Sequence, residues 1–581
     1  MISNNDGAFQ KICSEQKAKR DECLNKIICS KAPKKLIISG PGTGKTYIFK
    51  QILQQNASGK NLVMTFIRKL VDDMAKDLGT MAEVKTFHAY CKKILHEKCG
   101  GFELFPNLTK VIEDDARLLE KNYKDFDSKF QILEESSEEI KFYIERGEYY
   151  NVVSFNDSVY KLYKLLLNDP SIIGDYDYIL IDEFQDFNPL EVAFIKEIAK
   201  RGSILIVGDD DQAVYTGRHS SPIHLCEICN SGEYVFFELP YCCRCPKVIV
   251  EAVNAFIISV QKIGGMKGRI DRRFEPYLEA KEYENNNYPR IIKAQVNNLK
   301  TLSKYVLSEI QKIPIQDISD SKKVGDEYPT VLVIGQKHYL NEIQKKLEPI
   351  YPHLVYTYTK DFEIDAITVY NFFINNIDSN FSWRLLLFIY YSADIEYQKK
   401  IINASLTGLP LVQLLDPEFV KAHKYAADLL KLLKSGKKLS VNSEKDLKKI
   451  LGIHFKTLYE YYSIQEEEVA IAVDQSQPMI LLTSFEGCKG LSGGHIFIVG
   501  ANNGSLPRIV NGKIEDIECC RFIVALTRTR KCCHIVTNKW LYSPKDKEGK
   551  WMDPYEESCF LQFIPSNLLE DRGLIKGADL K

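Results

Sequence analysis

The sequence predicts an α/β protein with two parallel sheets, each interrupted by a mainly helical insertion. Wholly apolar runs of strand length recur along the chain, and most of them precede a loop and a run with helical periodicity. Such runs are typical of parallel strands that helices cover on both faces. They form an early group and a late group along the chain. The runs are Leu36–Ile38, Leu62–Phe66, Tyr178–Ile181, Ile204–Val207, Val331–Ile334, Ile480–Thr483 and Ile496–Val499.

Two longer stretches lack this alternation of strand-like and helical runs. Residues 91–170 and 376–475 have helical patterns, with apolar residues at three- and four-residue spacing in the later one. A chain of 581 residues is too long for one hydrophobic core, so we expect about three or four domains or subdomains. The expected division is a first α/β domain over 1–90 and 171–240 with its insertion at 91–170, and a second over 241–375 and 476–581 with a reduced insertion at 376–475.

The composition is that of a folded, non-exported protein. Hydrophobic residues make up 45% of the chain and charged residues 27%, and no apolar run reaches the ~18 residues of a membrane span. The N-terminus lacks the basic and apolar regions of a secretory signal, so the 16 cysteines are expected to be reduced thiols. The net charge of −1 does not exclude nucleic acid, which needs only a local basic groove. We expect a cytoplasmic protein that does not bind a membrane.

A glycine-rich loop gives the sharpest chemical signal. Residues 39–46, Ser-Gly-Pro-Gly-Thr-Gly-Lys-Thr, lie between an apolar run and a helical run. In that context backbone N–H groups curl around phosphate oxygens, and the positive end of the helix dipole faces them. Lys45 is expected to reach the β- and γ-phosphates of ATP, and Thr46 to hold Mg²⁺. A strict motif has glycine where Ser39 stands. The expected ATP contacts are Gly40, Pro41, Gly42, Thr43, Gly44, Lys45, Thr46 and Tyr47.

A second centre follows the apolar run Tyr178–Ile181, which ends in Asp182 and Glu183. At the carboxyl edge of a parallel sheet, Asp182 can hold the magnesium shell, and Glu183 can orient and deprotonate the attacking water. An acidic pair at a strand end is weak evidence alone. Here it extends into Asp-Glu-Phe-Gln-Asp-Phe-Asn, and the next strand-like run leads into Gly-Asp-Asp-Asp-Gln at 208–212.

These boxes resemble those of superfamily 1 DNA helicases of the UvrD/Rep/PcrA type, whose DEFQD and GDxxQ boxes are rarely found together elsewhere. The resemblance continues through most of the chain, in the family's order. It includes Thr65–Lys69 (TFTNKA-like), Thr86–Tyr90 (TFHSF-like), Leu239–Arg244 (NYR-like), Lys489–Leu491 (KGL), Val524–Arg528 (VALTR) and Ser558–Leu561 (SRFL-like). The resemblance implies that both α/β domains are RecA-like P-loop domains with ATP bound between them.

The resemblance also assigns catalytic roles. Beside Glu183, Gln212 would sense the γ-phosphate. Arg244 and Arg528 would arrive from the second domain and neutralise charge in the transition state. Closing the cleft on ATP and opening it after hydrolysis would move the domains along single-stranded DNA, in the 3′→5′ direction by resemblance.

For DNA, the resemblance implies two kinds of contact. Thr65, Thr86 and His88 would touch backbone phosphates, which positions the strand without reading its sequence. Phe66 and Tyr215 would stack on bases, which tolerates any sequence because every base has a π-face. For Phe66, a place in the hydrophobic core is an equal alternative.

Several positions depart from the family's pattern. Gly217 stands where the family has an aromatic that stacks on DNA, so one stacking platform is missing. Cys243 replaces the NYR tyrosine that stacks on adenine, and Tyr47 replaces an arginine after the phosphate loop. We hypothesise that Tyr47 takes over adenine stacking; packing against neighbouring helices is the alternative. Ser492 replaces a glutamate that contacts ribose, and Gln16 is the nearest, rather distant, candidate for the glutamine that recognises adenine.

Two cysteine pairs, Cys226-x2-Cys229 and Cys242-x2-Cys245, have the spacing of a zinc ribbon or a cluster site. The second pair brackets Arg244, which must face ATP, so a metal there would distort the cleft. We therefore favour cysteine used as a small apolar residue over a metal site.

The leading prediction is a DNA-stimulated ATPase that moves along single-stranded DNA and unwinds duplexes with single-stranded tails, using ATP and Mg²⁺. The alternative is an ATP-binding DNA-end sensor, or a regulatory subunit of a nuclease or phage-defence complex, with weak unwinding of its own. The missing aromatic at Gly217 and the short second insertion favour the alternative, whereas the complete catalytic set favours the motor. No nuclease motif is present, so a nuclease would be a separate partner protein.

Overall fold

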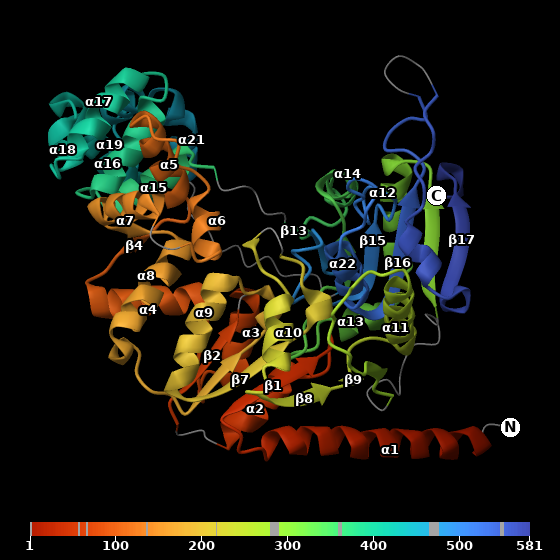
Figure 1. Ribbon diagram of the computed structural model, residues 1–581. Coiled ribbons are helices and arrows are strands. Elements are labelled where there is room, and N and C mark those ends of the chain that lie inside the picture. Colours follow the sequence, from red (N-terminus) through yellow and green to blue (C-terminus); the bar gives the residue numbers. More distant parts are fainter. Residues whose placement is uncertain are drawn as a thin grey trace.

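The computed structural model describes residues 3–55, 59–65, 68–134, 137–215, 218–278, 290–357, 363–463, 476–545 and 551–580. Two parallel sheets with their covering helices lie side by side, and a helical lobe stands over the first of them (Figure 1). Within these ranges, no helix is both long enough and apolar enough to cross a lipid bilayer.

The first sheet has six parallel strands in the order β3-β2-β6-β7-β1-β8. They are β1 (Lys34–Ser39), β2 (Asn61–Thr65), β3 (Glu83–Thr86), β6 (Tyr178–Ile181), β7 (Ser203–Gly208) and β8 (Val235–Leu239). The register aligns Leu36 with Ile206, and Met64 with Ile181. Since all strands run in one direction, the segments after β1, β6 and β7 meet at the same edge of the sheet. The phosphate loop and both acidic boxes therefore lie close together.

Side chains on this sheet alternate between two apolar layers. Ile37, Val63 and Leu180 point to one layer, and Ile38 and Met64 point to the other. The first layer is covered by α1 (Ser3–Ile28), α2 (Lys45–Gln54) and α3 (Arg68–Leu78). The second is covered by α4 (Phe87–Cys99), α9 (Pro189–Ile198) and α10 (Ile223–Asn230). Burial on both faces explains why the inner strands β6 and β7 are almost wholly apolar.

The second sheet has seven parallel strands in the order β13-β14-β12-β15-β16-β11-β17. They are β11 (Ile291–Val296), β12 (Val331–Ile334), β13 (Val355–Thr357), β14 (Ile480–Thr483), β15 (Gly493–Val499), β16 (Thr529–Asn538) and β17 (Leu569–Ile575). One face packs on α11 (Lys247–Lys262) and α22 (Asp516–Leu526), and the other on α12 (Leu299–Ile310) and α14 (Lys337–Leu347). The short α13 (Ile315–Asp320) precedes β12, and β9 (Tyr241–Cys242) pairs with β10 (Glu275–Pro276). The predicted fold class, with two parallel sheets, is confirmed.

The helical lobe is built from two segments far apart in the sequence (Figure 1). The first contains β4 (Glu103–Leu104), α5 (Leu108–Leu118), α6 (Phe126–Gln131), α7 (Glu138–Tyr150), β5 (Val152–Val153) and α8 (Phe155–Asn168). The second contains α15 (Ala366–Asn375), α16 (Asn380–Tyr390), α17 (Ile395–Ser405), α18 (Leu411–Leu414), α19 (Pro417–Lys434), α20 (Val441–Leu451) and α21 (Phe455–Ser463). Both segments contribute to one continuous hydrophobic core.

A buried ionic network joins the two segments of the lobe. Asp115 of α5 accepts hydrogen bonds from Arg146 (2.8 Å), Tyr150 (2.6 Å) and Arg384 of α16 (2.7 Å), and its side chain is fully buried. Arg384 also reaches Asp114 at 2.6 Å. Burial alone would raise the pKa of Asp115, but the two guanidinium groups hold it below its ordinary value. The network therefore links α5 and α7 to α16 through charged side chains that are buried.

Aromatic and backbone contacts extend this junction. Phe105 packs against Phe372 and Phe381 with ring centroids 5.6 and 4.9 Å apart. Asn380 donates to the carbonyl of Tyr149 at 3.2 Å, and Tyr149 donates to the carbonyl of Leu409 at 2.6 Å. Apolar packing and satisfied polar groups thus occur together across the junction.

Candidate active site

The phosphate loop connects β1 to α2 through two left-handed glycines. Gly42 has φ +71°, and Gly44, the residue before α2, has φ +96°. Side chains are disfavoured at such angles, and a Cβ on Gly42 would lie 2.5 Å from the Cβ of Arg244. Thr43 donates to the carbonyl of Gly40 at 3.0 Å, which closes the loop. The first amides of α2 therefore face the cavity, as anion binding requires.

The acidic pair lies directly beneath this loop. Glu183 adopts a left-handed backbone conformation with φ 53°, which turns the chain sharply after β6. Its carboxylate accepts from Lys45 at 2.6 Å and from Gln185 at 2.6 Å. Despite burial, which favours the neutral acid, Lys45 and Lys489 lower the pKa of Glu183. For neighbouring Asp182, burial dominates and raises the pKa to about 6.

These residues fit a divalent cation. The Oδ1 atom of Asp182 is buried and has no hydrogen-bond partner among the residues that the structure describes. It lines the same cavity as the Thr46 side chain. A carboxylate and a hydroxyl are oxygen ligands of the kind Mg²⁺ prefers, and a buried unpaired carboxylate oxygen is costly without a cation. The donor set therefore matches the magnesium site expected from the sequence.

A cavity of about 440 Å³ lies between the two sheets. The first domain contributes the phosphate loop, Asp182, Glu183 and Gln212, and the second contributes Arg244 and Arg528. Arg528 donates to the side-chain oxygen of Gln212 at 3.0 Å. Burial and the nearby Arg528 lower the pKa of Arg244 to about 10. The structure thus brings together every residue predicted for catalysis.

Lys489 is a site residue that the sequence analysis quoted only as part of a family box. Its ammonium reaches Asp186 at 2.6 Å, Glu183 at 3.6 Å and the carbonyl of Gln212 at 2.6 Å. It therefore links the second domain to both acidic boxes of the first. Arg530, which lines the cavity and holds Asp326 at 2.8 Å, was also missed.

The outer end of the cleft carries an aromatic cluster. Tyr47 is 47% exposed. The guanidinium of Arg20 lies 5.8 Å from its ring centroid and 5.0 Å from that of Tyr277. Gln16, one helical turn before Arg20, bonds the backbone of residues 276 and 278 at 3.3 and 3.1 Å. Tyr47 thus presents an exposed ring near the loop, and Arg20 is a neighbour that sequence patterns did not single out.

The predicted DNA-contacting residues lie in different environments. Thr65 is buried at the end of β2, and Thr86 caps α4 by accepting from the amide of Ala89 at 3.2 Å. Burial and Arg218 lower the pKa of His88 to about 3, so its imidazole is neutral. The hydroxyl of Tyr215 donates to a backbone carbonyl of the second domain at 3.0 Å. Phe66 and Gly217 lie outside the described residues, and the contacts with DNA stay predictions.

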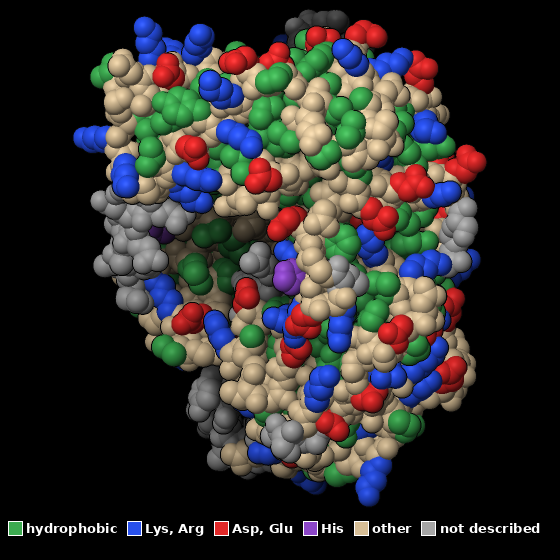
Figure 2. Space-filling view, turned by 90° about the vertical axis from the view of Figure 1, so that its left-hand side faces the viewer, with side chains coloured by type: hydrophobic (Ala, Val, Ile, Leu, Met, Phe, Trp, Pro, Cys, Tyr) green, Lys and Arg blue, Asp and Glu red, His purple; other side chains and the backbone are tan. Residues whose placement is uncertain are grey.

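A recess opens beneath the helical lobe on the face seen in Figure 2. Basic and acidic side chains are interspersed around it rather than separated. This mixture agrees with a net charge near zero.

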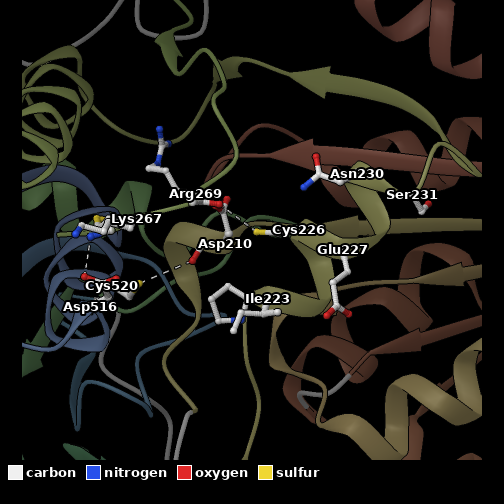
Figure 3. Close-up of a pocket in the computed structure, with 13 residues that line it drawn as sticks. Asp210, Ile223, Cys226, Glu227, Asn230, Ser231, Lys267, Arg269, Asp516 and Cys520 are labelled. Carbon is white, nitrogen blue, oxygen red and sulfur yellow. Dashed lines mark hydrogen bonds between the residues drawn. The ribbon is translucent and has the colours of Figure 1, made fainter. Parts of the chain in front are cut away.

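The two cysteine pairs do not form a four-sulfur metal site. In the described part of the chain, only Asp209, Asp210 and Asp211 bring three possible ligand atoms within 4.8 Å of one another. Arg269 and Arg272 pair with Asp211, each at 2.7 Å. Two arginines therefore offset part of the charge of this aspartate cluster. Cys226 lies apart, in a second cavity of about 490 Å³ between α10 and α22 (Figure 3).

A phosphate loop on one parallel α/β domain, faced across a cleft by arginines from another, defines a two-domain P-loop ATPase. Comparison with known proteins agrees. A family model described as an AAA domain matches residues 25–218. A probable DNA helicase II homolog of Mycoplasma capricolum subsp. capricolum is 24% identical, covering 85% of this chain and 81% of that protein.

Two further relatives extend the likeness. The ATP-dependent DNA helicase Rep of Buchnera aphidicola subsp. Schizaphis graminum is 24% identical over 85% of this chain and 90% of its own length. The ATP-dependent DNA helicase PcrA of Staphylococcus aureus is 23% identical over 92% of this chain and 85% of its own length. The chain is thus similar over most of its length to DNA helicases of the UvrD/Rep/PcrA type, the resemblance that its boxes predicted.

Proposed function

We propose that the protein is a DNA-stimulated ATPase whose hydrolysis cycle moves it along single-stranded DNA, 3′→5′, and unwinds duplexes. The observation that carries this proposal is the contact between Arg528 and Gln212, 3.0 Å long, across the cleft. It supports a cycle in which the second domain completes the ATP site of the first. The names of the relatives, all ATP-dependent or probable DNA helicases, support DNA as the substrate.

Each catalytic residue has a physical role in this proposal. Lys45 leaves its ion pair with Glu183 to hold the β- and γ-phosphates, since a phosphate competes for the same ammonium. Glu183, freed and ionised, orients the attacking water and accepts its proton. Arg244 and Arg528 neutralise the charge that develops on the transferred group. Mg²⁺, held through Thr46 and Asp182, supplies charge neutralisation when bound.

The coupling to movement runs through the residues that join the domains. Lys489 and Arg528 connect the second domain to Asp186 and Gln212 of the first. Binding of the γ-phosphate therefore changes contacts that span the cleft. Domain closure on ATP and opening after hydrolysis would shift Thr65, Thr86, His88 and Tyr215 relative to the bound strand.

A second candidate function is the DNA-end sensor or regulatory subunit. It is favoured by the segment after Gly217, which is engaged within the protein. His219 bonds Ser128 of the helical lobe at 2.7 Å, and Arg218 approaches Glu191 at 3.7 Å. Such anchoring would weaken the grip on bases. Under this alternative, unwinding is weak until a nuclease partner or a particular DNA end is present.

One experiment separates these functions in two stages. ATP hydrolysis by the purified chain is measured with and without single-stranded DNA, beside the Glu183→Gln variant as a negative control. Stimulation by DNA that disappears in the variant supports a DNA-coupled motor, whereas weak hydrolysis under both conditions favours the regulated subunit. Strand displacement on 3′-tailed, 5′-tailed and blunt duplexes then tests polarity, and single-stranded RNA replaces DNA to test the substrate class.

The exposed ring of Tyr47 yields a prediction about ATP affinity. Tyr47→Ala should weaken ATP binding by about tenfold, because base–aromatic stacking contributes about 1–3 kcal/mol. Tyr47→Phe, which keeps the ring, should bind as the original protein does. Titration with a fluorescent ATP analogue measures both. Equal affinity of the Ala variant would mean that Tyr47 only packs against the protein.

A further inference from the structure

We propose that Cys242 and Cys245 form an oxidisable dithiol that disables the ATP cleft when a hydroperoxide converts it to a disulfide. The pair is a modification site, separate from the groups assigned to ATP and DNA. Its effect on turnover rests on the proposed ATPase activity, whereas formation of the disulfide can be measured without it.

The local geometry favours reaction between the two sulfurs. Cys242 ends β9, and Cys245 stands just before Pro246 and the start of α11. The amide of Cys245 donates to the sulfur of Cys242 at 3.3 Å, so the turn brings the two cysteines together. A Cys-x-x-Cys pair at a helix N-terminus is the arrangement that stabilises a thiolate beside a second, resolving thiol.

The electrostatic surroundings make Cys242 unlike the other buried cysteines. Burial opposes ionisation, yet the hydrogen bonds from Cys245 and the charge of Arg244 lower the pKa of Cys242 to about 6. Burial raises the pKa of Cys488 and Cys533 to about 12. A thiolate is the nucleophile in thiol oxidation, so Cys242 is the expected point of attack.

The short segment that contains the dithiol contacts both sides of the cleft. On the first domain, the amide of Cys243 donates to the carbonyl of Gly42 at 2.9 Å. On the second, the thiol of Cys245 donates to the carbonyl of Thr527 at 3.3 Å. Thr527 precedes the catalytic Arg528, and Arg244 lies between the two cysteines. A change at the sulfurs therefore reaches the phosphate loop and both arginines.

The oxidation proceeds in two balanced steps. The Cys242 thiolate attacks one oxygen of hydrogen peroxide, the O–O bond breaks, and a sulfenic acid and hydroxide form. Cys245 then loses its proton and attacks the sulfur of Cys242; the S–S bond forms, and the sulfenic oxygen leaves as water. Two electrons pass from the two sulfurs to the peroxide. The thiol hydrogen that Cys245 gives to Thr527 is lost.

The ATP cavity is the expected route for the peroxide. Cys242 and Cys245 are fully buried, while Cys243 and Arg244 line the cavity of about 440 Å³. Peroxide is little larger than water, so it can approach when the cleft opens. A nucleotide bound in the cavity should slow the reaction.

The other Cys-x-x-Cys pair is a matched control. Cys226 and Cys229 lie inside α10 rather than before a helix, and burial raises the pKa of both thiols. Cys226 donates to the carbonyl of Gly268 at 3.5 Å and lines the cavity shown in Figure 3. The pair Cys226 and Cys229 therefore has the same spacing as Cys242 and Cys245, but it does not stand before a helix.

The test uses the full chain, reduced and then treated with hydrogen peroxide. Trypsin cuts between Arg244 and Cys245, so a Cys242–Cys245 disulfide leaves two peptides joined, which mass spectrometry detects after free thiols are blocked. We expect that joined pair, slower formation with a non-hydrolysable ATP analogue, and at least a tenfold loss of ATP hydrolysis that dithiothreitol restores. Absence of the joined peptides, or their presence with full activity, would overturn the proposal.

Variants assign the effect to the pair. Relative to its own reduced activity, Cys245→Ser should resist peroxide, with Cys245→Ala as the substitute if the serine variant does not fold. Cys226→Ser and Cys243→Ser should stay sensitive; protection by Cys243→Ser would mean that another thiol reacts, contrary to the proposal. If the reduced protein does not hydrolyse ATP, the proposed function fails separately, and binding of a fluorescent ATP analogue becomes the readout of the oxidised cleft.

Discussion

Replacement of Glu183 by glutamine is expected to lower ATP hydrolysis by about 100- to 10,000-fold, the usual contribution of a positioned general base. Glu183 is held at the end of β6 in a left-handed conformation, and Lys45 and Lys489 keep it ionised. Glutamine has nearly the same shape but cannot accept the proton of water. The variant should therefore bind ATP with little change while turnover nearly stops.

The measurement pairs steady-state phosphate release with titration of a fluorescent ATP analogue. Glu197→Gln is the control, because Glu197 lies near the C-terminal end of α9 and pairs with Lys200, whose side chain is 67% exposed. Its turnover should be unchanged. A loss smaller than tenfold in Glu183→Gln, with affinity retained, would indicate that a different group activates the water.

Asp115→Asn should lower the free energy of unfolding of the helical lobe by about 3–5 kcal/mol, because it leaves buried charge without its counterion. Arg384 has a fully buried side chain and Arg146 one that is 4% exposed, and both point at this carboxylate. The neutral amide cannot compensate the guanidinium of Arg146, while Arg384 keeps its contact with Asp114 at 2.6 Å. Chemical denaturation, followed by a probe in the lobe, measures the change.

A surface ion pair across the same junction provides the control. Lys399 of α17 pairs with Glu120, just beyond α5, and their side chains are 33% and 76% exposed. Lys399→Ala should lower the free energy of unfolding far less than Asp115→Asn, because exposed ion pairs contribute little. Equal effects of the two substitutions would mean that the buried network contributes no more than a surface pair.

The sequence was informative where chemistry demands particular residues at fixed spacing. The phosphate loop and the pair Asp182–Glu183 could be predicted because glycine, lysine and carboxylate must follow buried strands there. Two of the missed strands lie at sheet edges and carry charged residues. β3 has Glu83 and Lys85, and the outermost strand β17 reads Leu-Glu-Asp-Arg-Gly-Leu-Ile. Partly exposed strands tolerate charge, so no apolar run marks them.

Contacts between distant segments were beyond sequence patterns. The helical character of both insertions followed from periodicity, but the contact between Asp115 and Arg384 joins positions 269 residues apart. Local spacing contains no information on such a pairing. For the same reason, the sequence did not indicate the position of Arg20. Its contacts with Tyr47 and Tyr277 depend on the direction in which α1 runs.

The shared core of the helical lobe determines which parts of the molecule travel together. In the sequence, the helices α15–α21 of the lobe lie between strands β13 and β14 of the second sheet, so the chain connects the lobe to that sheet at both ends. The helical insertion of the second half nevertheless packs on that of the first domain, and the hydrogen bond between Arg384 and Asp115 joins the two. If the ATP cleft opens and closes as proposed, we expect the lobe and the phosphate loop to keep their mutual positions, because one hydrophobic core joins the lobe to the first sheet. The expected relative motion is then between this combined unit and the second sheet.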